Sequence, residues 1–267
     1  MASVGPVPMP VVVVLVCVLV AMSIARLWPS RQPVPPRPSG AGRVLDMLLV
    51  GLLCGRLSFI AANLALYLEA PWSIFQIADG GYHVAVVLVA ALGWGIWSLR
   101  RQPSLRVPVM CSALAGVLLW AGGSYGLARW QASTVSLPAV QVVDLQGRSL
   151  DLEQFQGRPL VLNLWASWCG PCRREMPVLA RAQQAHPEVQ FVFLNQGERQ
   201  DEVQQFLQAE HLALRNVLLD EPAAASTALG IRAYPSTLFF DGQGGLQDLH
   251  LGELTQAGLE HKLRRLR

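Results

Sequence analysis

The sequence is short of charge for its length. Only 15% of its 267 residues are charged, whereas 52% are hydrophobic, and an ordinary soluble protein of this size carries more charge and fewer apolar side chains. We therefore expect part of the chain to lie in lipid. Residues 1–130 hold nine Arg against three acids. The positive charge is therefore concentrated in the apolar half, where it indicates how the loops are oriented across the membrane, and it gives no support to nucleic-acid binding.

The polar half of the chain has little cysteine. Of the five cysteines, Cys17, Cys54 and Cys111 fall within apolar runs, and the polar half contains only Cys169 and Cys172. With no third cysteine, the polar half cannot contain a framework of structural disulfides. A disulfide between two cysteines so close together would constrain an unfolded chain little, so the pair indicates redox chemistry rather than cross-linking.

Four apolar stretches are long enough to cross a hydrocarbon core as helices. They lie near 7–28, 44–68, 83–99 and 107–128. The first has no basic residues before it and no convincing cleavage site, so we favour an uncleaved span over a signal peptide, which is the alternative. The sequence thus predicts a four-helix transmembrane domain over residues 1–130.

Two of the segments at the ends of these spans have no Lys or Arg: the amino-terminal ten residues and the loop 69–82. The other two loops contain Arg26, Arg31, Arg37, Arg43, Arg100, Arg101 and Arg106. Cytoplasmic loops accumulate Lys and Arg, which places the amino terminus and everything after Arg129 outside. We expect a multi-pass protein of a bacterial inner (cell) membrane whose carboxy-terminal domain lies in the periplasm or outside the cell.

A linker is expected at 131–138, and a second domain over 139–267. There the hydrophobic pattern changes to short alternating elements, which predicts strands near 139–143, 160–165, 189–194, 216–219, 236–240 and 246–250, and helices near 170–184, 199–209, 222–229 and 255–265. Strands separated by helices predict an α/β domain with a central mixed sheet flanked by helices. The glycine-rich turn 241–245 predicts a hairpin.

The stretch 160–172 contains a buried strand, a turn and the start of a helix. Cys169 would lie at the helix amino terminus, where unpaired N–H groups and the macrodipole stabilise a thiolate. Cys172 would lie one turn inside and be more buried. We therefore predict that Cys169 attacks a partner disulfide and that Cys172 resolves the mixed disulfide.

Residues 163–177 read NLWASWCGPCRREMP. This matches the pattern N-x-W-A-x-W-C-x-x-C-x-x-E-x-P, and from about residue 139 onward the chain resembles the TlpA/ResA-like membrane-anchored disulfide reductases of the thioredoxin superfamily. The resemblance implies a thioredoxin fold, a redox-active disulfide between Cys169 and Cys172, protein thiol or disulfide substrates, a membrane or periplasmic redox partner, and no cofactor or metal. The supporting positions in the motif are Asn163, Trp168, Gly170 and Pro171.

The same resemblance implies roles for two further residues. The dipeptide Tyr234-Pro235 precedes a predicted strand, as does the cis-proline with which thioredoxin folds bind extended substrate backbone. Asn163 stands where cytoplasmic thioredoxins keep a buried Asp, and in TlpA-like proteins the acid lies three residues after the second cysteine, which is Glu175 here. Glu175 is expected to lie on one helix face with Cys172, and either to raise the pKa of that thiol or to relay its proton.

Simpler interpretations of these residues exist. A lone C-x-x-C can be half of a zinc site, but neither a second cysteine pair nor a His cluster lies nearby in the sequence. Glu175 could be a solvated helix carboxylate, Pro235 an ordinary trans proline, and the whole domain a tethered binding module whose cysteines no longer react. The C-G-P-C sequence is that of thioredoxin, whose potential of about −270 mV is reducing, and this favours a reductase.

The membrane half has a second resemblance. Asp46, the stretch 54–57, the stretch 71–75 and the stretch 79–81 are similar to the amino-terminal half of prolipoprotein diacylglyceryl transferase. In that family a Gly-Gly pair is followed by Ser-x-His-Gly-Gly, whereas here it is followed by Tyr-His-Val, and a second Gly-Arg-x-Gly-Asn motif has no counterpart. The resemblance implies a degenerate membrane domain, with a lipid-modifying transferase carrying a redox appendage as the alternative function.

Arg56 is a candidate functional residue of the membrane half. A charge inside a span costs about 2.5 to 3.5 kcal/mol and usually faces a partner or a cavity. The alternative is that Arg56 snorkels or binds a lipid headgroup. Cys17, Cys54 and Cys111 could relay electrons through the membrane or could be small buried hydrophobic side chains.

Overall fold

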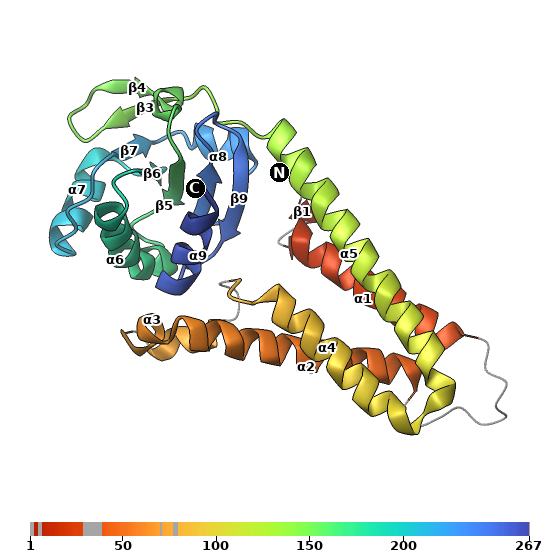
Figure 1. Cartoon of the computed structure of the whole chain (residues 1–267). Helices are drawn as coiled ribbons and strands as arrows, with labels where there is room; N and C mark the ends of the chain where they lie inside the picture. The colour runs from red at the N-terminus through yellow and green to blue at the C-terminus, as the bar shows by residue number, and fades with distance from the viewer. Residues whose placement is uncertain (1–2, 5–6, 29–38, 70, 77–79, 267) are drawn as a thin grey trace. The chain divides into compact units, whose positions relative to one another are not determined.

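The computed structural model describes residues 3–4, 7–28, 39–69, 71–76 and 80–266 (Figure 1). The described chain divides into two compact units. A helical unit is built from Ala2–Pro71 and Gly81–Leu127, and a sheet unit from Ala128–Arg267 together with Trp72–Gly80. Most of the arginine-bearing loop 26–43 and the acid Asp79 of the transferase-like pattern lie outside the described residues.

The helical unit consists mainly of five helices. They are α1 (Met9–Leu27), α2 (Gly40–Ala62), α3 (Leu64–Glu69), α4 (Val84–Ser98) and α5 (Arg106–Thr134), with the short strands β1 (Ser3–Val4) and β2 (Val7–Pro8) before them and the 3-10 turns η3 (Leu99–Arg101) and η4 (Pro103–Leu105) between α4 and α5. The 3-10 turn η1 (Pro71–Phe75), except for Pro71, and the end of α5 beyond Leu127 belong to the sheet unit. Ser39 caps α2, since its hydroxyl accepts a hydrogen bond from the Gly42 amide at 3.3 Å.

Three of the four predicted spans have the expected length. Among the described residues, Gly40–Ala62, Val84–Arg101 and Pro103–Leu127 are long and apolar enough to cross a membrane, whereas the apolar helix Val11–Leu27 is shorter. The prediction of four full spans is therefore not met in this part of the chain. The predicted first span began at residue 7, but residues 7 and 8 form strand β2 rather than helix.

The predicted span 44–68 is not one helix. The helix begins earlier, at Gly40, and is interrupted at Asn63, whose φ and ψ of −119° and 27° are not helical. Asn63 Nδ2 donates to the Phe59 carbonyl at 2.9 Å. A short polar side chain that bonds to nearby backbone in this way competes with the helix, which the apolar pattern of this stretch did not reveal.

Helices α2 and α4 pack closely through glycine. A Cβ atom on Gly55 would lie 2.3 Å from Val87 Cγ2, and one on Gly51 would lie 2.7 Å from the Val87 carbonyl oxygen. On the facing helix, a Cβ on Gly95 would meet Met47 Cε at 2.6 Å. Small residues at such positions let two apolar helices approach closely and gain dispersion contacts, as they do in membrane proteins.

The predicted linker 131–138 is partly helical and partly bound to the sheet unit. Helix α5 continues to Thr134. Beyond it, Leu137 is 1% exposed, its amide donates to Gly244 at 3.3 Å, and the Leu246 amide donates to Val135 at 3.2 Å. The end of this segment is fixed because it buries an apolar side chain and pairs its backbone groups.

The sheet unit contains a seven-stranded mixed sheet in the order β4-β3-β7-β6-β5-β8-β9. The strands are β3 (Gln141–Asp144), β4 (Ser149–Asp151), β5 (Leu160–Trp165), β6 (Gln190–Gln196), β7 (Val217–Asp220), β8 (Ser236–Phe240) and β9 (Leu246–Leu251). The central strands β5, β6 and β7 are parallel, and the outer strands pair antiparallel. All six predicted strands are present, and β4 is an additional short edge strand.

Helices cover both faces of this sheet. They are α6 (Gly170–Ala185), α7 (Gln200–Ala209), α8 (Ala224–Leu229) and α9 (Gln256–Leu266), close to their predicted positions, and the 3-10 turn η5 (Leu152–Phe155) follows β4. Side chains of α6, α7 and α9 form one core with Val161 and Phe193, and side chains of α8 form another with Leu162 and Leu194. Alternate strand residues point to opposite faces, so β5 is buried on both, and the predicted α/β domain is confirmed.

Candidate active site

The two cysteines lie where the chain has left β5 and α6 begins. Cys169 is the N-cap residue of α6 and forms a disulfide with Cys172. The Cys172 amide points at Cys169 Sγ, 3.2 Å away, and Pro171 occupies the first turn of the helix, where a missing N–H costs nothing. The Cys169 sulfur therefore lies at a helix amino terminus, where backbone dipoles stabilise a thiolate once the disulfide is reduced.

The two sulfurs differ in accessibility. Cys169 is 6% exposed and Cys172 is fully buried. Beside them, Trp168 is 69% exposed, and its ring lies edge-on to that of Tyr234 with 6.3 Å between centroids. Trp168 thus forms an exposed aromatic surface beside the cysteine pair, and Cys169 is the slightly more exposed of the two cysteines.

The Tyr234–Pro235 peptide bond is cis, so the alternative of an ordinary trans proline is wrong. Pro235 directly precedes β8, and the register of β5 with β8 pairs Leu164 with Ser236. This places the proline beside the end of β5 from which the chain runs into the redox turn. The cis-proline and the cysteine pair thus occupy the same edge of the sheet.

Glu175 is fully buried on α6, so it is not a solvated helix carboxylate. Its Oε1 accepts a hydrogen bond from Asn163 Nδ2 at 2.7 Å, and its Oε2 accepts one from the Leu254 amide at 3.0 Å. Asn163 Nδ2 also donates to Thr237 Oγ1 at 3.0 Å. Asn163 on β5 therefore donates a hydrogen bond to the buried acid of α6, Glu175.

Burial raises the pKa of Glu175 from 4.5 to about 8, because the protein interior disfavours its charged form. Hydrogen bonds from the Leu254 amide and Asn163 act in the opposite direction, and the nearby charge of Glu253 adds to the rise. A carboxyl group with a pKa near the working pH can both give and take a proton. Glu175 is three residues after Cys172, which puts both side chains on the same helix face.

Glu198 also belongs to this site, although it lies in no recognisable sequence motif. It follows β6, is buried, and accepts hydrogen bonds from the Ser167 amide at 2.7 Å, from the Ser167 hydroxyl and from Asn195 Nδ2 at 2.6 Å. It therefore fixes the turn that carries Trp168 into the redox helix. Its position in the sequence was the one available signal for its role: Glu198 comes directly after a strand parallel to β5, and the carboxyl ends of parallel strands meet at one edge of a sheet.

Arg56 is buried within the helical unit, with 8% of its surface exposed. Its guanidinium donates to the Gly81 carbonyl at 3.1 Å and lies 5.7 Å and 5.8 Å from the ring centroids of Tyr67 and Tyr82. These distances are typical of cation–π contacts. Asp46 pairs instead with Arg43, at 3.6 Å. Arg56 thus links α2 to α3 and to the segment before α4.

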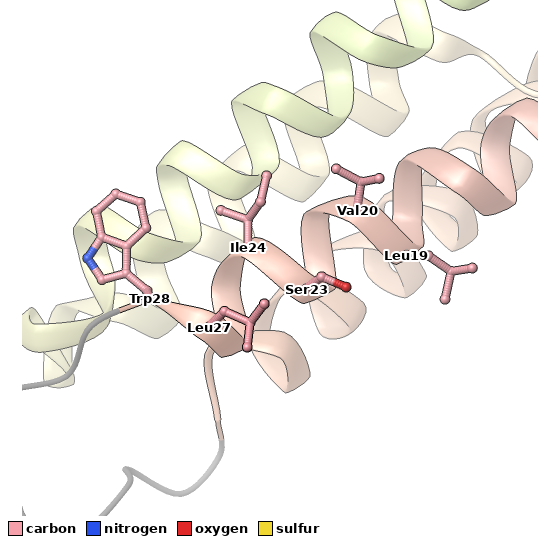
Figure 2. A pocket seen from close by; sticks show the side chains of 6 residues that line it. All are labelled: Leu19, Val20, Ser23, Ile24, Leu27 and Trp28. Carbon is pink, nitrogen blue, oxygen red and sulfur yellow. The ribbon is translucent and has the colours of Figure 1, made fainter.

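The three other cysteines are free thiols: Cys17 is buried, Cys54 is half-buried and Cys111 is exposed. In the part of the chain that the structure describes, no group of three or more His, Cys, Asp or Glu residues could hold a metal ion. Figure 2 shows a hollow on the helical unit, lined by Leu19, Val20, Ser23, Ile24, Leu27 and Trp28. Apart from the Ser23 hydroxyl and the Trp28 indole, the lining side chains are aliphatic.

Comparison with known proteins identifies the sheet unit. Residues 132–263 match the family model described as Redoxin. The chain is 30% identical over 132 residues to the thioredoxin-like protein YneN of Bacillus subtilis (strain 168), covering 47% of this chain and 75% of YneN. It is 30% identical over 119 residues to the thiol-disulfide oxidoreductase ResA of Halalkalibacterium halodurans, covering 44% of this chain and 67% of ResA.

A solved structure of MTB dsbF in its mixed oxidised and reduced forms is 27% identical, with a TM-score of 0.46 over 49% of this chain and 100% of that one. The resemblance of the membrane half to prolipoprotein diacylglyceryl transferase is not confirmed by these matches and stays a prediction. The disulfide at the start of α6 and the matches to YneN and ResA show that the chain belongs to the redoxin-domain thiol-disulfide oxidoreductases.

Proposed function

We propose that the chain is a membrane-tethered, extracytoplasmic thiol-disulfide reductase that works through its C-G-P-C pair. The observation that carries the proposal is the arrangement of the site: a disulfide at the amino terminus of α6, whose first cysteine is slightly exposed and whose second is fully buried, and a buried carboxyl group on the same helix face. The three helices of membrane length support the tether. The proposed membrane domain is residues 1–130, and the proposed catalytic domain is residues 139–267.

The proposed reaction begins with both cysteines reduced. The Cys169 thiolate attacks one sulfur of a disulfide in a partner protein, forming a mixed disulfide and releasing the partner's other sulfur as a thiolate. Cys172 then loses its proton and attacks Cys169 Sγ, which forms the intramolecular disulfide and releases the second partner sulfur. Two electrons pass from the cysteine pair to the partner protein, whose disulfide becomes two thiols.

Glu175 is the proposed proton acceptor for Cys172. A buried thiol resists ionisation, because the interior disfavours the thiolate, and Glu175 is the titratable carboxyl group on the same face of α6. In the reverse step a donor thiol attacks Cys169 in the disulfide, and the departing Cys172 thiolate takes a proton from the neutral acid. Since burial raises the pKa of Glu175 to about 8, the oxidised protein holds that proton ready at neutral pH.

The cycle requires a second protein to return the electrons. A dithiol donor in the membrane or the periplasm would reduce the Cys169–Cys172 disulfide and become a disulfide itself. Trp168 and Tyr234, beside the cysteine pair, offer an apolar surface to either partner. Pro235 is the proposed contact for extended substrate backbone at the same place.

The roles of the two cysteines are tested by a matched pair of variants in the full chain. Cys172→Ser should accumulate mixed disulfides with partner proteins, because the resolving thiol is gone. Cys169→Ser should accumulate none, since the remaining thiol is fully buried. Non-reducing gels of cells quenched in acid measure the adducts. Equal accumulation through both variants would contradict the proposal.

The tether and its orientation are tested separately. A reporter that is active only outside the cytoplasm, fused after Arg267, should be active, and the same reporter fused within the loop 100–106 should be inactive. A reporter active only in the cytoplasm should give the opposite pair of results. A cytoplasmic location for the fusion after Arg267 would reject the proposed orientation while leaving the chemistry of the cysteines unaffected.

A further inference from the structure

A short segment after β9 connects the parts of the active site. Residues 252–255, named here the acid-contact segment, lie between β9 and α9. The Gly252 amide donates to the Pro235 carbonyl at 2.9 Å, and the Leu254 amide donates to Glu175 Oε2 at 3.0 Å. The position of this segment therefore determines whether the buried carboxyl group receives a backbone hydrogen bond.

An ion pair fastens the acid-contact segment to the redox helix. Arg174 Nε and one of its terminal nitrogens lie 2.8 Å and 2.7 Å from Glu253 Oε2. The Arg174 side chain is 61% exposed and that of Glu253 is 19% exposed. Gln76, which belongs to the same compact unit, donates to the other Glu253 oxygen at 3.0 Å. Because Arg174 is largely exposed to solvent, the ion pair is expected to add little to global stability.

We propose that the Arg174–Glu253 ion pair is a latch that holds the acid-contact segment against α6 and keeps the Leu254 amide on the Glu175 carboxylate. Arg174 and Glu253 are positioning residues, which act on the reaction through Glu175. The inference rests on the proposed function, in which Glu175 exchanges the proton of Cys172.

The latch has a predictable effect on proton transfer. An N–H group that donates to a carboxylate stabilises its charged form, so a loosened Leu254 amide raises the pKa of Glu175. Other titratable groups at this place are Cys172 on α6 and His250 on β9, whose Nε2 lies 3.3 Å from the Glu253 carbonyl oxygen. The β5 and β8 strands contribute the neutral side chains of Asn163 and Thr237.

The sign of the shift separates a latch from a simple charge effect. Disulfide exchange with a model disulfide is measured against pH in the full chain in detergent micelles, for Arg174→Gln, Glu253→Gln and the double variant. A latch predicts that the midpoint of the Glu175-dependent limb rises in all three, by about half a pH unit in Arg174→Gln and by less in Glu253→Gln and the double variant, where loss of the Glu253 charge acts in the opposite direction. If the pair acts only through charge, Glu253→Gln lowers the midpoint, because the Glu253 charge raises the pKa of Glu175, and the latch is overturned.

Two controls complete the test. Arg173→Gln breaks a neighbouring ion pair on the same helix, with Glu210, and should leave the midpoint unchanged, since that pair does not touch the acid-contact segment. His250→Asn is introduced into both the wild type and Arg174→Gln, and the difference in midpoint between these two proteins should stay the same. A shift that vanishes with His250, or that Arg173→Gln reproduces, would overturn the latch.

A readout that does not depend on catalysis separates this inference from the proposed function. Hydrogen exchange of the Leu254 amide, followed by mass spectrometry of the full chain, should speed up several-fold in Arg174→Gln and Glu253→Gln and stay unchanged in Arg173→Gln. If Glu175→Gln retains the wild-type rate profile, the proposed role of Glu175 as proton acceptor fails while disulfide exchange by the cysteines stands, and hydrogen exchange still tests the latch. Unchanged exchange in both latch variants overturns the latch alone.

Discussion

Replacing Glu175 by Gln should change how the stability of the sheet unit depends on pH. In the folded protein burial raises the pKa of this carboxyl group to about 8 from an ordinary value of 4.5. Between these two values the folded state holds a proton that the unfolded state has released, so the free energy of unfolding falls as pH rises. At about 1.4 kcal/mol per pH unit, the wild type should lose at most about 5 kcal/mol between pH 4.5 and 8.

The Gln variant cannot ionise at this position, so its stability should vary much less over the same range. Hydrogen exchange of the β5 amides in the oxidised full chain, in detergent micelles and corrected for intrinsic exchange rates, gives the free energy of opening at each pH. Glu210→Gln removes an exposed carboxylate paired with Arg173 and serves as the control, with a wild-type profile. Parallel profiles for wild type and Glu175→Gln would refute the assignment of a buried, neutral acid.

Three further substitutions test the packing and the site. Leu162→Ala should lower the free energy of unfolding of the sheet unit by about 2 to 5 kcal/mol, because it leaves a cavity beneath a fully buried strand, measured by the same exchange. Gly55→Leu should destabilise the helical unit by about 1 to 3 kcal/mol in thermal unfolding, whereas Gly93→Leu, where an added Cβ meets nothing within 4 Å, should be tolerated. Glu198→Ala should slow disulfide exchange about tenfold, because it releases the turn before the redox helix by removing hydrogen bonds to a charged group. A wild-type rate of exchange would show that Glu198 is dispensable.

The sequence carries most of the information about the sheet unit, because its elements have clear periodicity. Residues 160–165 are apolar enough to predict a buried strand, and the motif that follows locates the cysteine pair and the helix acid. The dipeptide Tyr234-Pro235 before a predicted strand locates the cis-proline. Strand β4 was not predicted, because three residues at a sheet edge give no recognisable alternation. The break at Asn63 was missed for a related reason, since one polar residue hardly alters a long apolar run.

What the sequence could not supply are the contacts between residues far apart in the chain. The Leu254 amide lies 79 residues from Glu175, and the Glu253 carboxylate is equally far from Arg174. Neither segment has a motif of its own, so only the three-dimensional fold shows that they meet. Glu198 meets the turn before Cys169 in the same way. The motif thus identifies the reacting groups, and the fold identifies the groups that position them.

The redox state of the Cys169–Cys172 pair in living cells tests the central claim most directly. Cells are quenched in acid and their free thiols are labelled with a reagent that adds mass, with Cys172→Ser and Cys169→Ser as references for a single labelled thiol of the pair. A reductase kept ready by its electron donor should carry two labels at this pair, and the labels should be lost when the donor is exhausted by an excess of disulfide. A pair found as a disulfide under all growth conditions would contradict the account.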